Sequence, residues 1–199
     1  MNNPLPNLNE PIQTKRLYIR GLQKGDGKNY YKVSLRNKEH LAEFESDNVV
    51  NEVKSEEGAE SIVRELAEGW EAGKYFFMGM FDKKTDDFVG QIYVGPANWD
   101  LPEFQIGYFA DVDQEGKGYI TEAVRAVIEM LFDKCMAHRI RLDCSDRNVR
   151  SIKVAERCGL TREGYFRENK KHPDGSFSGD VHYAILKNEF DLLKSSRKS

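Results

Sequence analysis

The sequence predicts a single α+β domain with a mostly antiparallel, seven-stranded sheet flanked by helices. Two patterns support this prediction: short aromatic and β-branched runs typical of strands, and longer segments whose apolar residues recur every three or four positions, as in amphipathic helices. The third observation is the order of these segments, which is strand, helices, three strands, helix, strand, helix and two strands. That order leaves one strand-helix-strand crossover near the middle of an otherwise antiparallel sheet.

The first half of the chain supplies one strand and then helices. A half-buried strand is expected at 16–20, because polar and apolar residues alternate there. Two short helical pieces are expected next, at 29–35 and around Leu41. A longer helix begins after Ser55, which is a plausible N-cap, and its apolar residues keep helical spacing until Gly73 ends it.

Turn residues bound the later elements. Aromatic and β-branched runs at 75–81 and 88–94 flank a polar connection suited to a hairpin, and Gly95 with Pro96 ends the second run. The other expected elements are a strand at 103–110, a helix from Gly118 to Cys135, a strand at 139–144, a helix at 149–158 closed by Gly159, and strands at 161–169 and 177–186 joined by a turn at 173–175.

Length and composition bound the organisation. The 199 residues suit one domain at 14–194, between a flexible, proline-containing arm at 1–13 and a flexible tail at 195–199. The net charge is −3, which argues against a nucleic-acid surface. There is no apolar run long enough to span a membrane and no secretory leader is readable, so we expect a cytoplasmic protein with no membrane partner. A homodimer is left open.

The cysteines and histidines give no metal or nucleophile pattern. Cys135, Cys144 and Cys158 are odd in number and lack Cys-x-x-Cys spacing, so we expect buried free thiols and no metal site. The four histidines are scattered through the chain, and no catalytic triad can be argued from them.

The strand at 103–110 runs into a glycine-rich turn that opens a helix. Gly116 and Gly118 lack a Cβ, so their backbone N–H groups can approach a ligand closely, and the helix start adds unpaired N–H groups that suit a phosphate. Lys117 could add a full positive charge. The turn does not fit a P-loop, because Gly118 replaces the required Ser or Thr, and it lacks the third glycine of the dinucleotide-binding fingerprint. An ordinary strand-to-helix turn remains the alternative.

Three segments together resemble a known family. They are Ile106-Gly107-Tyr108 followed by Gly116-Lys117-Gly118-Tyr119-Ile120-Thr121-Glu122-Ala123, then Asn148-Val149-Arg150-Ser151, and then Glu156-Arg157-Cys158-Gly159-Leu160-Thr161-Arg162-Glu163-Gly164. They are similar to the GNAT N-acetyltransferases, and within them to the ribosomal-protein alanine acetyltransferase (RimJ/RimL) branch. The opening 14–20 also fits the first strand of that branch, so the resemblance covers roughly residues 11 to 190.

The resemblance implies a cosubstrate, acetyl-CoA, and a place for it. In this family the fourth and fifth strands splay apart, and the pantetheine arm lies in the opening as an added strand would. Phe109, Ala110 and Asp111 would offer backbone groups to that arm, and one N–H would polarise the thioester carbonyl as an oxyanion donor. The diphosphate would be held by Gln114, Glu115, Gly116, Lys117, Gly118 and Tyr119. Asn148 would bind the pantetheine, and Arg157 would reach the adenosine end.

The resemblance also implies an acid, and chemistry requires a base. Many GNAT enzymes have a tyrosine seven residues after the asparagine, where this chain has Ala155, so Ser151 inherits the role of proton donor to the thiolate. Glu103 and Glu168 are the candidate general bases. Relatives often carry Glu where this chain has Gln105, which is a departure from the family pattern.

Three functions are consistent with the sequence and the resemblance. The first is direct acetyl transfer from acetyl-CoA to a protein N-terminal α-amine, of the ribosomal-protein type. An α-amine, with a pKa of about 7.7–8.0, needs only a modest base, whereas a lysine at about 10.4 needs a stronger one. The alternatives are a polyamine or other small-amine acetyltransferase, and a CoA-binding regulatory module without turnover, which Ala155 and Gln105 would fit.

Overall fold

The computed structural model describes residues 10–44, 48–172 and 174–196. Within those ranges it has eight strands, one more than the sequence predicts, in the spatial order β1-β2-β3-β4-β5-β6-β8-β7. The strands are β1 (Ile12–Gln13), β2 (Leu17–Gly21), β3 (Phe76–Asp82), β4 (Phe88–Asn98), β5 (Glu103–Ala110), β6 (Arg139–Ser145), β7 (Thr161–Lys171) and β8 (Phe177–Leu186). The helices are α1 (Gly27–Phe44), α2 (Glu56–Glu71), α3 (Tyr119–Lys134), α4 (Val149–Cys158) and α5 (Lys187–Ser196), with 3-10 turns η1 (Val49–Glu52) and η2 (Val112–Gln114).

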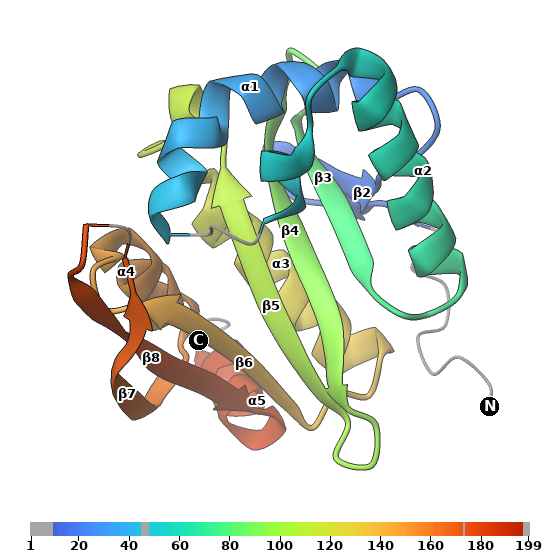
Figure 1. Cartoon of the computed structure of the whole chain (residues 1–199). Helices are drawn as coiled ribbons and strands as arrows, with labels where there is room; N and C mark the ends of the chain where they lie inside the picture. The colour runs from blue at the N-terminus through green and yellow to red at the C-terminus, as the bar shows by residue number, and fades with distance from the viewer. Residues whose placement is uncertain (1–9, 45–47, 173, 197–199) are drawn as a thin grey trace.

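The sheet is antiparallel except where β5 meets β6. Those two strands run parallel and pair at only three positions, from Glu103 opposite Arg139 to Gln105 opposite Arg141. Beyond Gln105 the ribbons of β5 and β6 diverge, which is plain in Figure 1. The predicted crossover is therefore confirmed, and so is the splay that the resemblance placed between the fourth and fifth predicted strands.

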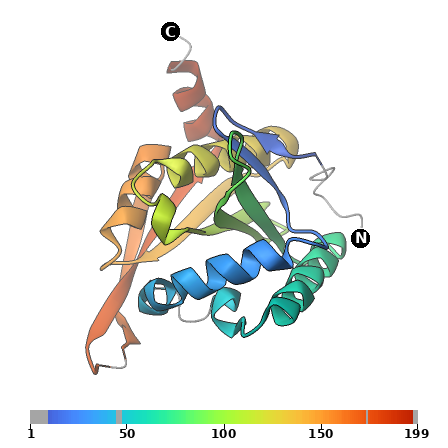
Figure 2. The same cartoon turned by 90° about the horizontal axis from the view of Figure 1, so that it is seen from above.

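Helices cover the two faces of the sheet unequally. Helices α1 and α2 lie together on one face and pack over β3 and β4 (Figures 1 and 2). Helix α3 lies on the other face, where its apolar side joins the core built from the inward residues of β2 to β6 and β8. Among the described residues, α1 and α2 do not extend over the first face of β6 and β8, where half-buried polar residues lie. Every helix within the described ranges is too short or too polar to cross a membrane.

Capping residues fix several helix ends as the sequence predicts. The Ser55 side chain accepts a hydrogen bond from the Gly58 N–H at 3.0 Å and starts α2. Gly159 ends α4 with a left-handed backbone, φ 89°.

The prediction of two short helical pieces was wrong, because α1 is one continuous helix. No glycine or proline interrupts the chain between Gly27 and Phe44, so nothing breaks the helix there.

Two predicted boundaries also differ. The strand at 88–94 was expected to stop at Gly95 and Pro96, but β4 continues to Asn98. Pairing with β3 ends at Val94, so Pro96 pairs only with β5 and its missing N–H is not needed on the other side. Within the predicted arm, Ile12 and Gln13 form β1 against β2, while residues 1–9, Pro173 of the predicted turn, and 197–199 of the predicted tail lie outside the described residues.

Candidate active site

The opening between β5 and β6 exposes one edge of β5. The Asp111 N–H donates to the Val89 carbonyl at 3.0 Å, so it faces β4. Because backbone groups alternate in direction along a strand, those of Phe109 face β4 as well, whereas those of Tyr108 and Ala110 face the opening. Of the three residues expected to meet the pantetheine, Ala110 therefore presents its N–H and C=O to the gap.

The glycine turn at the end of β5 has the backbone that its glycines were expected to provide. Gly116 and Gly118 have φ of +74° and +79°, in the left-handed region that favours glycine. Gly118 is the N-cap of α3 and makes no side-chain cap, so the first N–H groups of a 16-residue helix remain available to an anion. Lys117 Nζ turns back onto its own loop and donates to Gln114 Oε1 at 2.7 Å.

A cavity of about 470 Å³ joins the turn, the open edge of β5 and the start of α4. All the residues predicted to bind the cosubstrate line it except Asp111 and Lys117. It is also lined by residues that sequence reasoning missed, namely His40, Leu41, Ile120, Thr121, Arg147, Val149, Arg150, Lys153 and Val154, together with Tyr108.

Basic side chains concentrate on the α4 side of this cavity. Arg147, Arg150, Lys153 and Arg157 all line it, although only Arg157 was predicted. Arg147 precedes α4, whereas Arg150, Lys153 and Arg157 recur at three- and four-residue steps along it, which was a readable signal because such residues share a face. Phosphate groups of a nucleotide suit this arrangement of cations beside a helix N-terminus.

Glu115 bridges two elements across the cavity. One carboxylate oxygen lies 2.9 Å from His40 Nε2 on α1, and the other pairs with the Arg150 guanidinium on α4. In the sequence Glu115 was expected to help hold the diphosphate, yet an anion there competes with a phosphate for Arg150. Cosubstrate binding through Arg150 therefore requires that this arginine exchange one anionic partner for another.

Asp111 anchors the turn through its side chain. The carboxylate is fully buried, pairs with the Arg36 guanidinium and accepts from Asn37 Nδ2 at 3.2 Å. Asn37 Oδ1 in turn accepts from the Val112 N–H at 2.7 Å. The hydrogen bonds to Asp111 raise the pKa of Arg36 above its ordinary value, so the guanidinium stays charged. This network ties the end of β5 to α1 and sets the direction in which the turn leaves the sheet.

The predicted pair on α4 lies beside the opening. Asn148 is the N-cap of α4, and its Oδ1 accepts from the Ser151 N–H at 3.0 Å. Ser151 lines the cavity, and its carbonyl accepts a hydrogen bond of 3.4 Å from the Tyr108 hydroxyl of β5. The contact joins α4 to the open strand edge, near the end where a thiol would leave.

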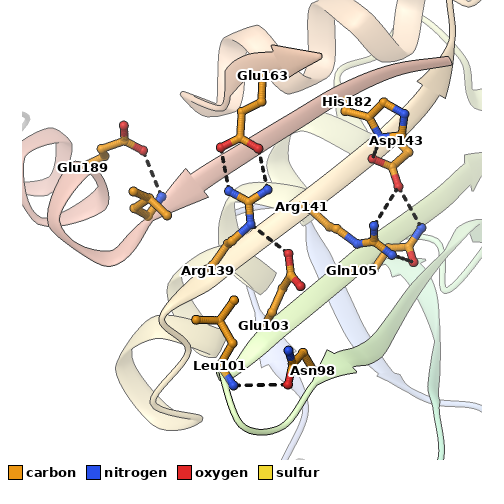
Figure 3. A network of polar contacts seen from close by, with 11 residues as sticks. Asn98, Leu101, Glu103, Gln105, Arg139, Arg141, Asp143, Glu163, His182 and Glu189 are labelled. Carbon is orange, nitrogen blue, oxygen red and sulfur yellow. Dashed lines mark hydrogen bonds and ion pairs between the residues drawn. The ribbon is translucent and has the colours of Figure 1, made fainter. Parts of the chain in front are cut away.

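The two predicted base candidates lie away from the opening. Glu103 begins β5 at its closed end, and its Oε1 accepts from Arg139 Nε at 2.8 Å (Figure 3). Arg139 also binds Glu163 at 2.6 Å, which holds the pKa of Glu163 below its ordinary value. Glu168 is exposed on β7, at an irregular stretch where its φ is +49°.

A second polar cluster was not predicted. Asp143 of β6 and His182 of β8 face each other across paired strands, with Oδ1 and Nδ1 2.8 Å apart (Figure 3). The two residues are 39 positions apart, so only the register of β6 against β8 reveals the pair.

The cysteines do not offer a nucleophile. Cys135 and Cys158 are buried as predicted, whereas Cys144 is half-buried. Burial raises the pKa of the Cys135 thiol to about 11 and that of Cys144 to about 12, so at neutral pH these two are thiols and not thiolates. In the described ranges no group of three or more His, Cys, Asp or Glu side chains is placed to hold a metal ion.

Comparison with known proteins decides the family. The profile of the acetyltransferase (GNAT) domain matches residues 16–161, most of the chain. The chain belongs to the GNAT acetyltransferase family. It is 30% identical over 190 residues to the uncharacterized N-acetyltransferase YnaD of Bacillus subtilis (strain 168), covering 90% of this chain and 99% of that protein. It is 29% identical over 161 residues to the probable N-acetyltransferase YjcK of the same strain, covering 80% of this chain and 88% of that protein.

A solved structure agrees in fold. The chain superposes with a TM-score of 0.79 on RimL, described as a ribosomal L7/L12 alpha-N-protein acetyltransferase in complex with coenzyme A, at 20% identity over 89% of this chain and 98% of that one. As a GNAT N-acetyltransferase, the chain takes acetyl-CoA as its acetyl donor. The open β5 edge, the glycine turn and the basic side of α4 border one cavity.

Proposed function

We propose that the acceptor of this N-acetyltransferase is the α-amine at the N-terminus of a protein. The observation that supports this best is the open face of β5, β6 and β8, where half-buried polar residues lie beside the splay without the helical cover that β3 and β4 have. An extended chain end can lie along such a face and bring its terminal nitrogen to the opening. The likeness to RimL, named as an alpha-N-protein acetyltransferase, agrees with this acceptor.

The reaction is a direct transfer. The acceptor nitrogen forms a bond to the thioester carbon, the carbon–sulfur bond breaks, and no acyl group passes to the enzyme. The raised pKa values of Cys135 and Cys144 support direct transfer, because neither thiol is ionised at neutral pH. The Ala110 N–H, which faces the opening, donates to the carbonyl oxygen as negative charge builds on it, and such a donor lowers the barrier by about 2.7–4 kcal/mol.

Binding and proton delivery fall to the turn and to α4. The N–H groups from Gly116 to Tyr119 and the cations of α4 hold the diphosphate and the adenosine phosphate, and Asn148 binds the pantetheine. Ser151 gives its hydroxyl proton to the departing thiolate and regains one from water. An α-amine suits this site because about a tenth of such groups is already neutral at pH 7, given a pKa of about 7.7–8.0.

Mass spectrometry after incubation with acetyl-CoA tests the acceptor. The panel consists of peptides that begin with Ala, Ser or Met, the same peptides with blocked N-termini and an internal lysine, and spermidine. We expect one acetyl group on the free N-terminus of at least one peptide and none on its blocked counterpart. Acetylation confined to spermidine or to lysine would overturn the proposal.

Thiol release distinguishes the remaining alternative, a CoA-binding module without turnover. Calorimetry with coenzyme A gives the affinity, and a thiol reagent gives the rate of CoA formation with and without the amine panel. Saturable binding with no release above background for any amine would favour the module over the enzyme.

A further inference from the structure

A polar cluster lies on the open face where β5 and β6 separate (Figure 3). Its members are Gln105 of β5, Arg141 and Asp143 of β6, and His182 of β8. The residues next to them along the strands, such as Ile106, Leu142 and Tyr183, are buried in the core shared with α3. Since side chains alternate between the two faces of a sheet, the cluster points away from α3 and into the open side.

Asp143 is placed at the start of the splay. Gln105 opposite Arg141 is the last pair that joins β5 to β6, and two further residues in the same register would set Gly107 opposite Asp143. There the strands have parted, and Gly107 carries no side chain to cover the opening. The next residue, Tyr108, lines the cosubstrate cavity, so Asp143 stands across the gap from the stretch that would hold the thioester.

The two oxygens of Asp143 differ in their partners. Oδ1 is 2.8 Å from His182 Nδ1. Within the described part of the chain, Oδ2 has only longer contacts, 3.4 Å to Gln105 Nε2 and 3.7 Å to Arg141 Nη1. The side chain is about one-fifth exposed, at 21%. One oxygen is therefore engaged inside the sheet, and the other keeps lone pairs for a donor that enters the opening.

His182 is held in one orientation. The Phe166 ring lies over it with centroids 4.3 Å apart, and Nδ1 is bonded to Asp143. Its Nε2 is buried and has no hydrogen-bond partner among the described residues. With the ring proton on Nδ1, that site holds only a lone pair, and the Nδ1–H donates to the Asp143 carboxylate.

We propose that Asp143 is the catalytic base that contacts the acceptor amine and takes its proton, and that His182 is the positioning residue that orients Asp143. The ammonium form of the acceptor gives one proton to Asp143 Oδ2, and the freed lone pair forms the carbon–nitrogen bond. Asp143 passes this proton to water and then takes the second proton of the nitrogen as the carbon–sulfur bond breaks, and passes that proton to water as well. The thiolate takes the hydroxyl proton of Ser151, which Ser151 regains from water, so one proton per turnover is released on balance. This inference rests on the proposed function.

The geometry favours Asp143 over the two glutamates named from the sequence. Glu103 sits four positions before Gly107, at the closed end of β5, and the Arg139 guanidinium already binds its carboxylate. Glu168 is exposed on β7, two strands beyond β6. Asp143 combines a position at the opening with an oxygen that has no short contact.

The test compares four variants with the wild type. D143N removes the base at constant size, H182L removes the Nδ1–H donor, and H182N supplies a side-chain amide donor in its place. D133N is the control, because Asp133 lies on α3, on the opposite face of the sheet, and accepts a hydrogen bond from Lys194 at 2.5 Å. Each variant is assayed with acetyl-CoA and the peptide that the wild type acetylates best, from pH 6 to 9, and its coenzyme A affinity is measured by calorimetry.

We expect D143N to lower kcat/KM at pH 7 by about 100-fold, the lower end of the range for a lost general base. The deficit should shrink toward pH 9, where the α-amine loses its proton to water unaided. H182L should lower kcat/KM by about tenfold, H182N should restore most of it, and D133N should match the wild type. Coenzyme A affinity should stay within threefold in all four.

A second readout does not depend on turnover. The proton NMR spectrum should contain a downfield imidazole N–H signal that is present in the wild type and in D133N and absent from D143N and H182L. If D143N folds poorly, H182L and H182N still decide the pairing.

The possible failures are distinct. A D143N enzyme with more than a third of wild-type kcat/KM at pH 7 would overturn the assignment of the base while leaving the proposed function intact. Equal loss in H182L and H182N would refute the positioning role. A wild type that binds coenzyme A but acetylates no amine would overturn the proposed function, and this inference with it.

Discussion

Replacing the turn glycines by alanine separates their contribution to folding from their contribution to binding. Gly116, Gly118 and Gly175 all have left-handed backbones, with φ of +74°, +79° and +83°. Among the described residues, a Cβ would have no neighbour within 4 Å at Gly116 or Gly175, and at Gly118 it would make only an ordinary 3.6 Å contact with Arg16. The cost to folding is therefore the backbone strain alone, about 1–2 kcal/mol at each site. Scanning calorimetry should show a loss in Tm of about 2–8 °C in each variant.

Binding should distinguish these three variants. At Gly116 and Gly118 the added Cβ stands where backbone N–H groups must approach a diphosphate, whereas Gly175 lies in the β7–β8 turn. Losing one hydrogen bond to a charged group costs about 1.5–3 kcal/mol, so G116A and G118A should weaken coenzyme A binding by roughly 10- to 100-fold in titration calorimetry. G175A should bind as the wild type does. Wild-type affinity in both loop variants, or an equal loss in G175A, would refute the role given to this turn.

Two further variants test the anchors of the site. D111A leaves the Asn37 amide and the Arg36 guanidinium without their carboxylate partner. Because the Arg36 side chain is 41% exposed, we expect the free energy of unfolding to fall by about 3 kcal/mol, the low end for a broken buried pair. The Tm should then be lower by about 6–12 °C. A decrease in Tm of less than about 2 °C would show that the Asp111 network does not stabilise the fold. Burial opposes the ionisation of Glu122, but hydrogen bonds from Thr14 and Arg16 outweigh it and lower its pKa. That stabilisation is present above the pKa of the unfolded carboxyl and is lost as pH falls through the lower folded value, so E122Q should reduce Tm at pH 7 and the difference should close in acid. A difference that is constant with pH would contradict it.

Local patterns predicted most of the fold. The helix at 149–158 came from the spacing of apolar residues and from Gly159, and the structure has it at the same residues. Strand β1 was not predicted, because its two residues, Ile12 and Gln13, are too few to show an alternating pattern and form a strand only by pairing with β2. Continuity of α1 could have been predicted, because the segment lacks any helix breaker.

The cosubstrate side of the site followed from the sequence because its parts are local. A glycine turn, a helix start and the capping asparagine each occupy a few consecutive residues, and the resemblance assembled them. The residues on the acceptor side could not be predicted from the sequence, because they become neighbours only through the pairing register of β5, β6 and β8. Asp143 meets His182, and Glu103 meets Arg139, only once β6 has paired with β8 and β5. No spacing rule in one sequence encodes those neighbours.

The three-residue contact between β5 and β6 has a mechanical consequence. The two halves of the sheet are hydrogen-bonded to each other only at one end. The rest of the β5 edge that faces β6 pairs with no strand of the described chain. A molecule bound in the opening between β5 and β6 would therefore stabilise the sheet as well as react. Amide hydrogens of Tyr108 and Ala110 should then exchange faster in the empty protein than those of Phe109 and Asp111, which face β4, and coenzyme A should slow them the most.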